Sequence, residues 1–315
     1  TVREQQESRE HEYMSPYASF SDESRGRDKP EPQCDMRTIY QRDRDRILHS
    51  KSFRRLKHKT QVFLAPEGDH YRTRLTHTLE VAQIARSISR ALRLNEDLTE
   101  AIALGHDLGH TPFGHAGEFV LNGLCDESFH HNEQSVRIVE KLEKDGKGLN
   151  LTWEVRDGIL NHRTAGKPST LEGQVVRLCD KIAYIHHDMD DAIRAGILSE
   201  DDIPITIRVV LGDTCRERLN TLIHDIVEQS RGTEYVRQSA EIAEGMRMLR
   251  ELMFANVYRN PEAKKEEEKA KKMLISLYTY YQEHPEQMSR EYRNLIGCGE
   301  DKTQVVCDYI AGMTD

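Results

Sequence analysis

Apolar residues spaced three or four positions apart constrain this chain more than any other feature of its sequence. In the segment 76–92 they would form one stripe on a helix: Leu79, Ala82, Ala85, Ile88, Ala91 and Leu92. Similar patterns predict further helices at about 98–107, 132–144, 152–162, 172–195, 214–230, 237–257 and from 261 onward. The only strand-like run is 60–65, with a polar turn behind it. The sequence therefore predicts an all-α fold with at most a small β-hairpin.

Polar residues before several apolar stripes indicate where these helices begin. Ser, Thr, Asn and Asp side chains cap the first turn, and an acid three residues later completes a capping box. The expected caps and boxes are Asn132, Thr152, Ser169 with Glu172, and Thr214 with Glu217. Residues 1–36 carry charge, Ser and Pro without apolar periodicity, so we expect an N-terminal arm that packs onto another part of the protein or stays mobile.

Composition limits the class of protein. The 315 residues are 37% hydrophobic and 31% charged, and none of the apolar runs approaches the roughly 20 residues of a membrane span, which argues against a membrane partner. This length fits one large domain or two ordinary ones. The six cysteines contain no CxxC pair and this sequence does not open with a basic-then-apolar stretch, so we expect reduced thiols and a cytoplasmic location.

Charge is distributed unevenly along the chain. The formal net charge of −9 argues against a protein that coats nucleic acid nonspecifically. Between residues 37 and 59, however, nine Lys and Arg face only Asp43 and Asp45, a local excess of seven positive charges. An anionic molecule could bind there, and a solvated basic face is the alternative.

His106 and Asp107 are adjacent at the end of a predicted helix. Alone, this pair is better explained as a hydrogen-bonded surface pair. His77 lies on the preceding helix and Asp180 on a later one, and apolar stripes would bring both against His106. Two imidazoles and two carboxylates suit a divalent ion with positions open for water and substrate, so the four residues predict a catalytic metal site.

The turn after this pair adds further histidines. His110 stands four residues from His106, while His115 and Glu118 are three apart and can hydrogen-bond if a helix begins near Gly114. A Gly-Pro loop whose histidines bond only the backbone is the alternative. Because ionisable side chains are costly to bury unpaired, we favour His115 as a proton donor oriented by Glu118.

Four motifs together resemble the HD-domain deoxynucleoside triphosphate triphosphohydrolases, the dGTPase-like family. They are RTRLTHTLEVAQIAR around His77, HDLGHTPFGHAGE (106–118), HNEQS (131–135) and CDKIAYIHHDMDDAI (179–193). RDRILHSKSFRRLKHKTQVF (44–63) and the final DYIAGMTD are similar to family segments as well. The resemblance covers about 37–196, and it implies an HD helical bundle at 37–197 with a C-terminal helical region, 198–315, packed on it.

The resemblance also implies roles for individual residues. A divalent ion (Mn, Mg, Fe, Ni or Zn) would be held by His77, His106, Asp107 and Asp180. The catalytic residues would be His115, Glu118 and His131, and the substrate contacts Gln61, Val62, Arg74, Lys181, Tyr184 and Asp188. Asp180, Lys181, Tyr184 and Asp188 follow i, i+1, i+4 and i+8, so one helix would hold most of them on one side.

The implied reaction is hydrolysis of a deoxynucleoside triphosphate such as dGTP to deoxynucleoside and tripolyphosphate. An HD phosphohydrolase of another nucleotide (monophosphate, cyclic or guanosine tetraphosphate) and a nucleotide- or single-stranded-DNA-binding regulator are the alternatives. The family favours a homo-oligomer. The basic segment 37–59 would then cover the triphosphate, form a regulatory nucleotide site between subunits or bind single-stranded DNA.

Overall fold

The described part of the chain is helical. The structure, a computed structural model, describes residues 1–61, 71–125, 128–258 and 261–315, except for the side chains of 261–265. Within these ranges all regular elements are helices, and the only β-contacts are isolated bridges between Arg27 and Thr152 and between Thr60 and Thr73. The predicted all-α class is therefore confirmed. Residues 62–65 of the expected strand lie outside the described residues.

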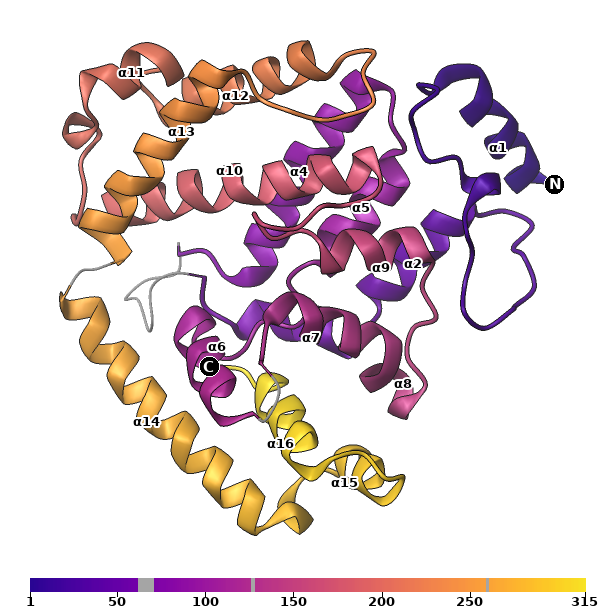
Figure 1. Ribbon diagram of the computed structural model, residues 1–315, viewed down its shortest axis with the longest axis vertical. Coiled ribbons are helices and arrows are strands. Elements are labelled where there is room, and N and C mark those ends of the chain that lie inside the picture. The colour runs from indigo at the N-terminus through magenta and orange to yellow at the C-terminus, as the bar shows by residue number, and fades with distance from the viewer. Residues whose placement is uncertain (62–70, 126–127, 259–260) are drawn as a thin grey trace.

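The first hydrophobic core lies where α4 and α5 meet α10. In Figure 1, α10 crosses α4 and α5 beneath a layer made by α11, α12 and α13. α5 packs between α4, α2 and α9, and its apolar residues are buried on nearly all sides. The helices of this core are α2 (Ile39–Leu48), α4 (Arg74–Leu92), α5 (Glu96–Gly105), α9 (Trp153–Leu160), α10 (Leu171–Arg194), α11 (Ile205–Leu211), α12 (Cys215–Ser230) and α13 (Ala240–Met253).

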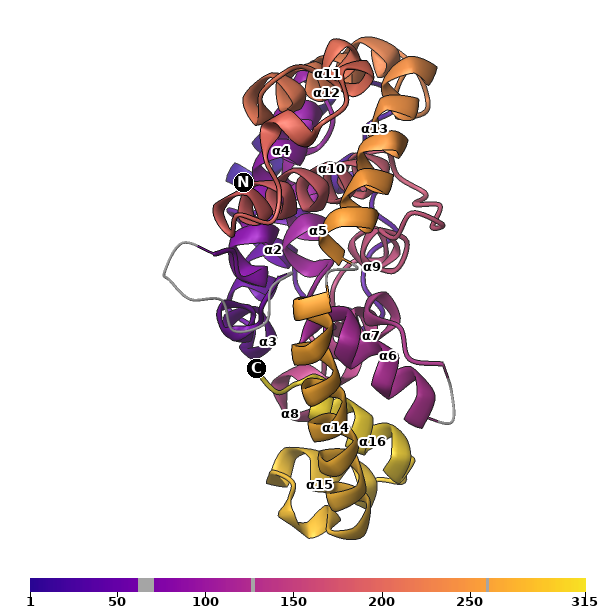
Figure 2. The same ribbon diagram turned by 90° about the vertical axis from the view of Figure 1, so that its left-hand side faces the viewer.

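A second hydrophobic core occupies the lower end of the molecule in Figures 1 and 2. Val120 and Leu121 of α6 are buried there against Leu274, Val305 and Ile310. Its helices are α6 (Gly114–Leu124), α14 (Pro261–Glu283), α15 (Arg290–Gly297) and α16 (Lys302–Ala311). The helix that begins in the HDLGHTPFGHAGE segment thus packs on the C-terminal helices.

The expectation that all six cysteines are reduced is wrong for this structure. Cys125, just after α6, forms a disulfide with Cys307 of α16, while Cys34, Cys179, Cys215 and Cys298 are free. The two bonded cysteines are 182 residues apart, and packing of α6 on the C-terminal helices brings their Cα atoms to 6.7 Å. Sequence spacing could not show this because neither cysteine belongs to a motif.

The N-terminal arm packs onto the first core and explains one error in the predicted caps. α1 (Val2–Tyr13) is a helix that the sequence did not predict. Glu172 does not form the expected box with Ser169; its carboxylate accepts hydrogen bonds from the backbone of Ser19 and Asn95, and Thr170 caps α10 instead. Hydrogen bonds to a buried carboxylate, here from one amide of the arm and one at the start of α5, are worth more than a local cap.

Some of the other capping predictions are confirmed and others are wrong. Thr152 occupies the N-cap position of α9, but its hydroxyl donates to the Asp43 Oδ2 at 2.6 Å and makes no capping bond. Thr214 with Glu217 forms the expected box. Asn132 is wrong as a cap, because α7 begins one residue earlier and the Asn132 amide donates to the Leu160 carbonyl. The remaining α-helices of the described residues are α3 (Lys51–Arg55), α7 (His131–Arg137) and α8 (Glu143–Gly146). There are also two π-helical turns, at Ile138–Leu142 and Phe254–Tyr258, and short 3₁₀ turns at Ser21–Glu23, Leu56–His58, Glu200–Asp202 and Pro285–Gln287.

Most of the basic segment 37–59 is neutralised within the chain. Five of its nine cations form ion pairs with carboxylates, and a sixth, Lys59, is buried. The paired cations are Arg37, Arg42, Arg44, Arg46 and Lys51. Among the helices that the structure describes, we find none whose length and apolar content suit a bilayer crossing.

Candidate metal centre and active site

Local structure places the four expected metal ligands on three helices. Thr73 caps α4 by accepting from the Thr76 amide, so His77 lies in its first turns. α5 ends at Gly105, and His106 and Asp107 follow at its C-terminal end. A Cβ on Gly105 would lie 2.5 Å from the Ile159 Cδ1, so a larger residue there would require the Ile159 side chain to move. Asp180 comes from the middle of α10.

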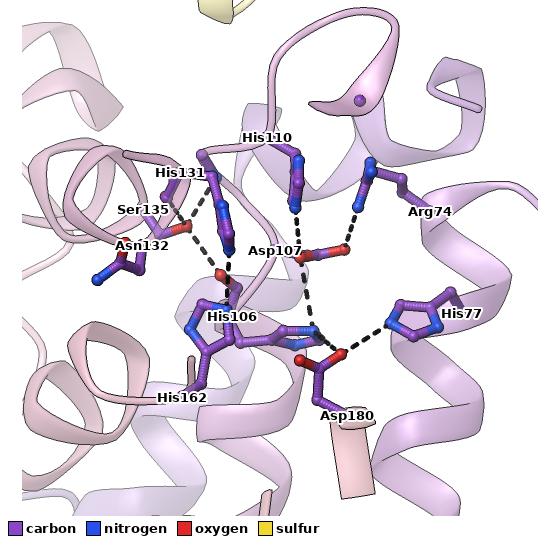
Figure 3. Close-up of polar contacts among 12 residues, drawn as sticks. Arg74, His77, His106, Asp107, His110, His131, Asn132, Ser135, His162 and Asp180 are labelled. Atoms are coloured by element: carbon purple, nitrogen blue, oxygen red, sulfur yellow. Dashed lines mark hydrogen bonds and ion pairs between the residues drawn. The ribbon is translucent and has the colours of Figure 1, made fainter. Parts of the chain in front are cut away.

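The four side chains converge on one point (Figure 3). The Asp180 Oδ1 lies 3.2 Å from the His77 Nε2 and 3.6 Å from the His106 Nε2. The His106 Nε2 is also 3.6 Å from the Asp107 Oδ1. Ligand atoms at about 2.1 Å from one ion are separated from each other by roughly 3.0–3.4 Å, so this group is close to the spacing of a single coordination sphere.

An unpartnered nitrogen shows that the group fits a cation. The His106 Nδ1 is 2.6 Å from the Ala103 carbonyl, which can only accept, so Nδ1 carries the hydrogen. In the neutral ring the His106 Nε2 presents a lone pair, and this atom is fully buried and has no hydrogen-bond partner. A lone pair facing two carboxylates is repulsive unless a cation lies between them. This donor set matches a divalent ion.

The charges around this site also favour a positive charge at this point, carried either by a proton on His106 or by a bound cation. Burial alone would lower the pKa of His106, but Asp107 and Asp180 raise it to about 9. Burial opposes ionisation of Asp107, yet His106 and Arg74 hold the pKa of that carboxyl below its usual range. The two carboxylates therefore stay ionised and create a negative potential that attracts a cation at this point.

Asp107 is shared with two further groups. The Arg74 Nη1 donates to the Asp107 Oδ2 at 2.9 Å, which fixes the carboxylate and aligns the guanidinium beside the site. Asp107, His110 and His131 form a second cluster whose ligand atoms lie within 4.8 Å of one another. Gly109 allows this approach, since a Cβ there would lie 2.3 Å from the His131 carbonyl oxygen.

The expected acid and histidine pair of α6 lies beside the metal ligands. The His115 Nδ1 is 3.5 Å from the Glu118 Oε2, and the His115 side chain is 84% exposed. Glu118 also accepts from the Nδ1 and the backbone amide of His131, at 3.0 and 3.1 Å. Burial raises the pKa of Glu118, but the hydrogen bonds from His115 and His131 outweigh it and hold the pKa well below its usual range.

His162 is a site residue that the sequence did not reveal. Its Nδ1 is 2.7 Å from the Ile159 carbonyl and its Nε2 is 3.1 Å from the His131 Nε2. Burial lowers the pKa of His162 to about 3, so the ring is neutral and its Nε2 accepts. His131 then donates from both nitrogens, to Glu118 and to His162. A lone His at the end of a helix carries no sequence signal of its own.

A cavity of about 680 Å³ opens in front of these groups. His106 and Lys181 do not line it: His106 lies fully buried beneath the floor, and Lys181 is half-buried on α10. Val62 lies outside the described residues. The other expected site residues all line the cavity: Gln61, Arg74, His77, Asp107, His115, Glu118, His131, Asp180, Tyr184 and Asp188.

Two side chains from the C-terminal half complete the far wall. The Tyr258 hydroxyl donates to the Asp188 Oδ2 at 2.6 Å, and the Arg250 Nε donates to the Tyr184 hydroxyl at 2.9 Å. Burial raises the pKa of Asp188 to about 6. Neither Arg250 nor Tyr258 was predicted, because no motif could be recognised in residues 198–300.

Comparison with known proteins agrees with this geometry. Residues 74–185 match the HD domain and residues 236–315 the phosphohydrolase-associated domain. A deoxyguanosinetriphosphate triphosphohydrolase-like protein of Caldanaerobacter subterraneus subsp. tengcongensis is 60% identical, covering 100% of this chain and 92% of the relative. A protein of the same name from Desulfatibacillum aliphaticivorans is 51% identical, covering 100% and 95%.

The fold also has a solved counterpart. A phosphohydrolase from Bacteroides thetaiotaomicron VPI-5482 superposes with a TM-score of 0.52 and 18% identity, over 84% of this chain and 64% of that one. At this identity the likeness concerns the fold alone. The full-length relatives carry the assignment: the chain belongs to the HD-domain family of deoxyguanosinetriphosphate triphosphohydrolase-like proteins.

Proposed function

We propose that this phosphohydrolase converts deoxynucleoside triphosphates to deoxynucleosides and tripolyphosphate. One observation carries the proposal: a buried His/Asp cluster suited to a divalent ion lies at the floor of a cavity whose wall presents His115 and Glu118. Names of relatives that share the whole chain support this substrate class. Hydrolysis would break the bond between the α-phosphorus and the 5′ oxygen and form a new P–OH bond from water.

Cations of the chain would hold the triphosphate. A divalent ion bound by His77, His106, Asp107 and Asp180 would supply charge neutralisation at the α-phosphate and activation of a water nucleophile. Arg74 lies at the floor beside that cluster and Arg250 lines the far wall. Burial, more than the nearby Arg250, lowers the pKa of Lys181, which does not line the cavity and would act on the triphosphate only at longer range. About four negative charges on the triphosphate would be shared mainly among the ion, Arg74 and Arg250.

His115 would protonate the departing 5′ oxygen. The ring lines the cavity, and the ionised Glu118 lies 3.5 Å from its Nδ1 and would orient it toward the leaving oxygen. His131, held by Glu118 and His162, would bring a further positive charge toward the phosphates. After the transfer, the deoxynucleoside leaves with its 5′ hydroxyl.

Tyr184 and Asp188 would receive the sugar. They lie one turn apart on the cavity face of α10, and each is fixed by a side chain from the C-terminal half. A tyrosine held in this way against C2′ leaves no room for a 2′ hydroxyl. Gln61 lines the cavity, and we propose that it and Val62 contact the same sugar. We expect dGTP to be hydrolysed much faster than GTP.

A nucleotide panel tests the proposal. The purified protein, loaded in turn with Mn²⁺, Mg²⁺, Fe²⁺, Ni²⁺ and Zn²⁺, is incubated with each dNTP and NTP, a cyclic nucleotide, a monophosphate and guanosine tetraphosphate. The expected products, identified by mass, are deoxynucleoside and tripolyphosphate from dNTPs only. Release of pyrophosphate, or turnover of only another nucleotide class, would contradict the proposal and indicate a different HD phosphohydrolase.

We further propose a homo-oligomer in the cytoplasm. Large apolar side chains at the surface support self-association: Phe119, Ile205 and Val209 are 71%, 66% and 79% exposed. Light scattering after gel filtration measures the mass. A regulatory nucleotide or single-stranded DNA at segment 37–59 has less support, because most of its cations are already paired. A gel shift with single-stranded DNA tests that alternative.

A further inference from the structure

Asp315 reaches across the molecule to two segments that line the active site. Its Oδ2 accepts from the Thr60 amide at 2.6 Å and its Oδ1 accepts from the Phe113 amide at 2.8 Å. The Asp315 amide donates in turn to the His58 carbonyl at 3.1 Å. The C-terminal end lies beside α6 in Figure 1 and beside α3 in Figure 2. One carboxylate therefore joins chain segments that are more than 50 residues apart.

Both segments lead directly to site residues. Thr60 precedes Gln61 of the cavity wall, and the carbonyl before it, that of Lys59, accepts from the Arg74 amide at 2.9 Å. Phe113 is the N-cap residue of α6 and adopts a left-handed φ of 59°, which few bulky residues tolerate. His115 follows two residues later. A shift of the Phe113 amide would therefore move the start of the helix that carries His115.

Lys59 makes a second link between the same parts. Its side chain is buried, and its ammonium donates to the carbonyl of His110 and, at 2.8 Å, to the carbonyl of Ala311 at the end of α16. Burying an ammonium group costs free energy unless its hydrogens are bonded, so the hydrogen bonds from Lys59 to these carbonyls are strong. Burial lowers the pKa of Lys59 to about 7.

The two hydrophobic cores explain why such links matter. The metal ligands come from α4, α5 and α10 of the first core, whereas α6, with His115 and Glu118, buries its apolar face in the second core. The distance between the metal ligands and His115 therefore depends on how the C-terminal helices sit against the first core. A rate that depends on geometry can fall roughly 100-fold for a displacement of about 1 Å.

We propose that Asp315 and Lys59 form a clasp through which the C-terminal helices position His115 and Glu118 against the metal ligands. Both are positioning residues, since neither lines the cavity. The expected change in kcat rests on the proposed function, whereas the expected change in amide hydrogen exchange does not.

The test compares Asp315→Ala and Asp315→Asn with wild type in the full chain. The alanine variant should lose tenfold to a hundredfold in kcat for dGTP. KM should stay within about threefold and metal content unchanged, because the cavity cations and metal ligands remain. Hydrogen exchange should accelerate at the Thr60 and Phe113 amides. The asparagine variant, which keeps one acceptor oxygen, should lose less in kcat than the alanine variant.

Asp301→Ala is the matched control. Asp301 caps α16 by accepting from the Gln304 amide at 2.8 Å and is exposed, so its loss lowers the melting temperature without touching the site walls. It should leave kcat unchanged. Lys59→Met is a second variant that breaks the other link and should reduce kcat in the same way as Asp315→Ala.

Three results would overturn the clasp. They are unchanged exchange at Thr60 and Phe113 in Asp315→Ala, a kcat within twofold of wild type despite faster exchange, or an equal loss of kcat in Asp301→Ala. If wild type hydrolyses no dNTP, the proposed function fails separately. The Asp315 and Asp301 variants are then compared with wild type by hydrogen exchange and by their rate of hydrolysis of bis(p-nitrophenyl) phosphate, a general phosphodiester probe. The same three results, with this rate in place of kcat for dGTP, would overturn the clasp.

Discussion

Replacing His115 by alanine should separate catalysis from stability in this protein. The side chain is 84% exposed and its only close polar partner among the described residues is Glu118, at 3.5 Å. Surface substitutions of this kind usually change the free energy of unfolding by about 0.5 kcal/mol or less. A general acid contributes roughly 10²- to 10⁴-fold, which at about 1.36 kcal/mol per decade raises the barrier by about 2.7 to 5.4 kcal/mol.

The assay is steady-state hydrolysis of dGTP beside a thermal unfolding curve. We expect kcat to fall by two to four decades with little change in KM or melting temperature. His130→Ala is the matched control, because its Nδ1 also lies near Glu118, at 3.8 Å, and it lines the same cavity. That variant should keep kcat within a few-fold of wild type.

A change of leaving group tests the role of the proton itself. In a dGTP analogue with sulfur in the bridging 5′ position, the leaving thiolate needs no proton, so His115→Ala should approach the wild-type rate. The reasoning is refuted if the variant keeps its full kcat with dGTP, or if the sulfur analogue shows the same loss as dGTP.

Three further predictions follow from the same structure. Asp180→Asn removes one charged ligand and should abolish metal binding, measured as metal content after dialysis and as loss of metal-dependent thermal stabilisation, about 2.7 kcal/mol at 100-fold excess over Kd in wild type. Because the pKa of Asp188 in the folded protein is raised to about 6, the free energy of unfolding of the wild type should fall as pH rises from about 4 through 6. In urea unfolding, Asp188→Asn should flatten this pH dependence and gain up to about 3 kcal/mol at pH 7. An unchanged pH dependence would contradict the buried charge. Without reductant, the denatured chain should show four titratable thiols, and Cys307→Ser should cost roughly 2–4 kcal/mol of stability; six thiols would exclude the Cys125–Cys307 bond.

Helices with a long apolar stripe were predictable because their period is a local property. α4, α5, α10 and α12 appear close to the predicted ranges, with boundaries displaced by a few residues. α1, α2, α3 and α11 were not predicted, and α6 was expected only on the condition that a helix begins near Gly114. α1 has little apolar periodicity and contains two buried glutamates, and the Phe113 amide at the start of α6 donates to a residue 202 positions away.

The helical class, the family and the residue types of the candidate metal site could be inferred from the chain alone, because periodicity, motif spacing and donor chemistry are local properties. Which further groups line that site depends on how distant helices pack together. His162, Arg250 and Tyr258 reach the cavity from segments without recognisable motifs, and the Cys125–Cys307 bond and Asp315 depend on how the second core packs. Such contacts join residues far apart in sequence, so their geometry is fixed by packing and leaves no periodic trace in the sequence.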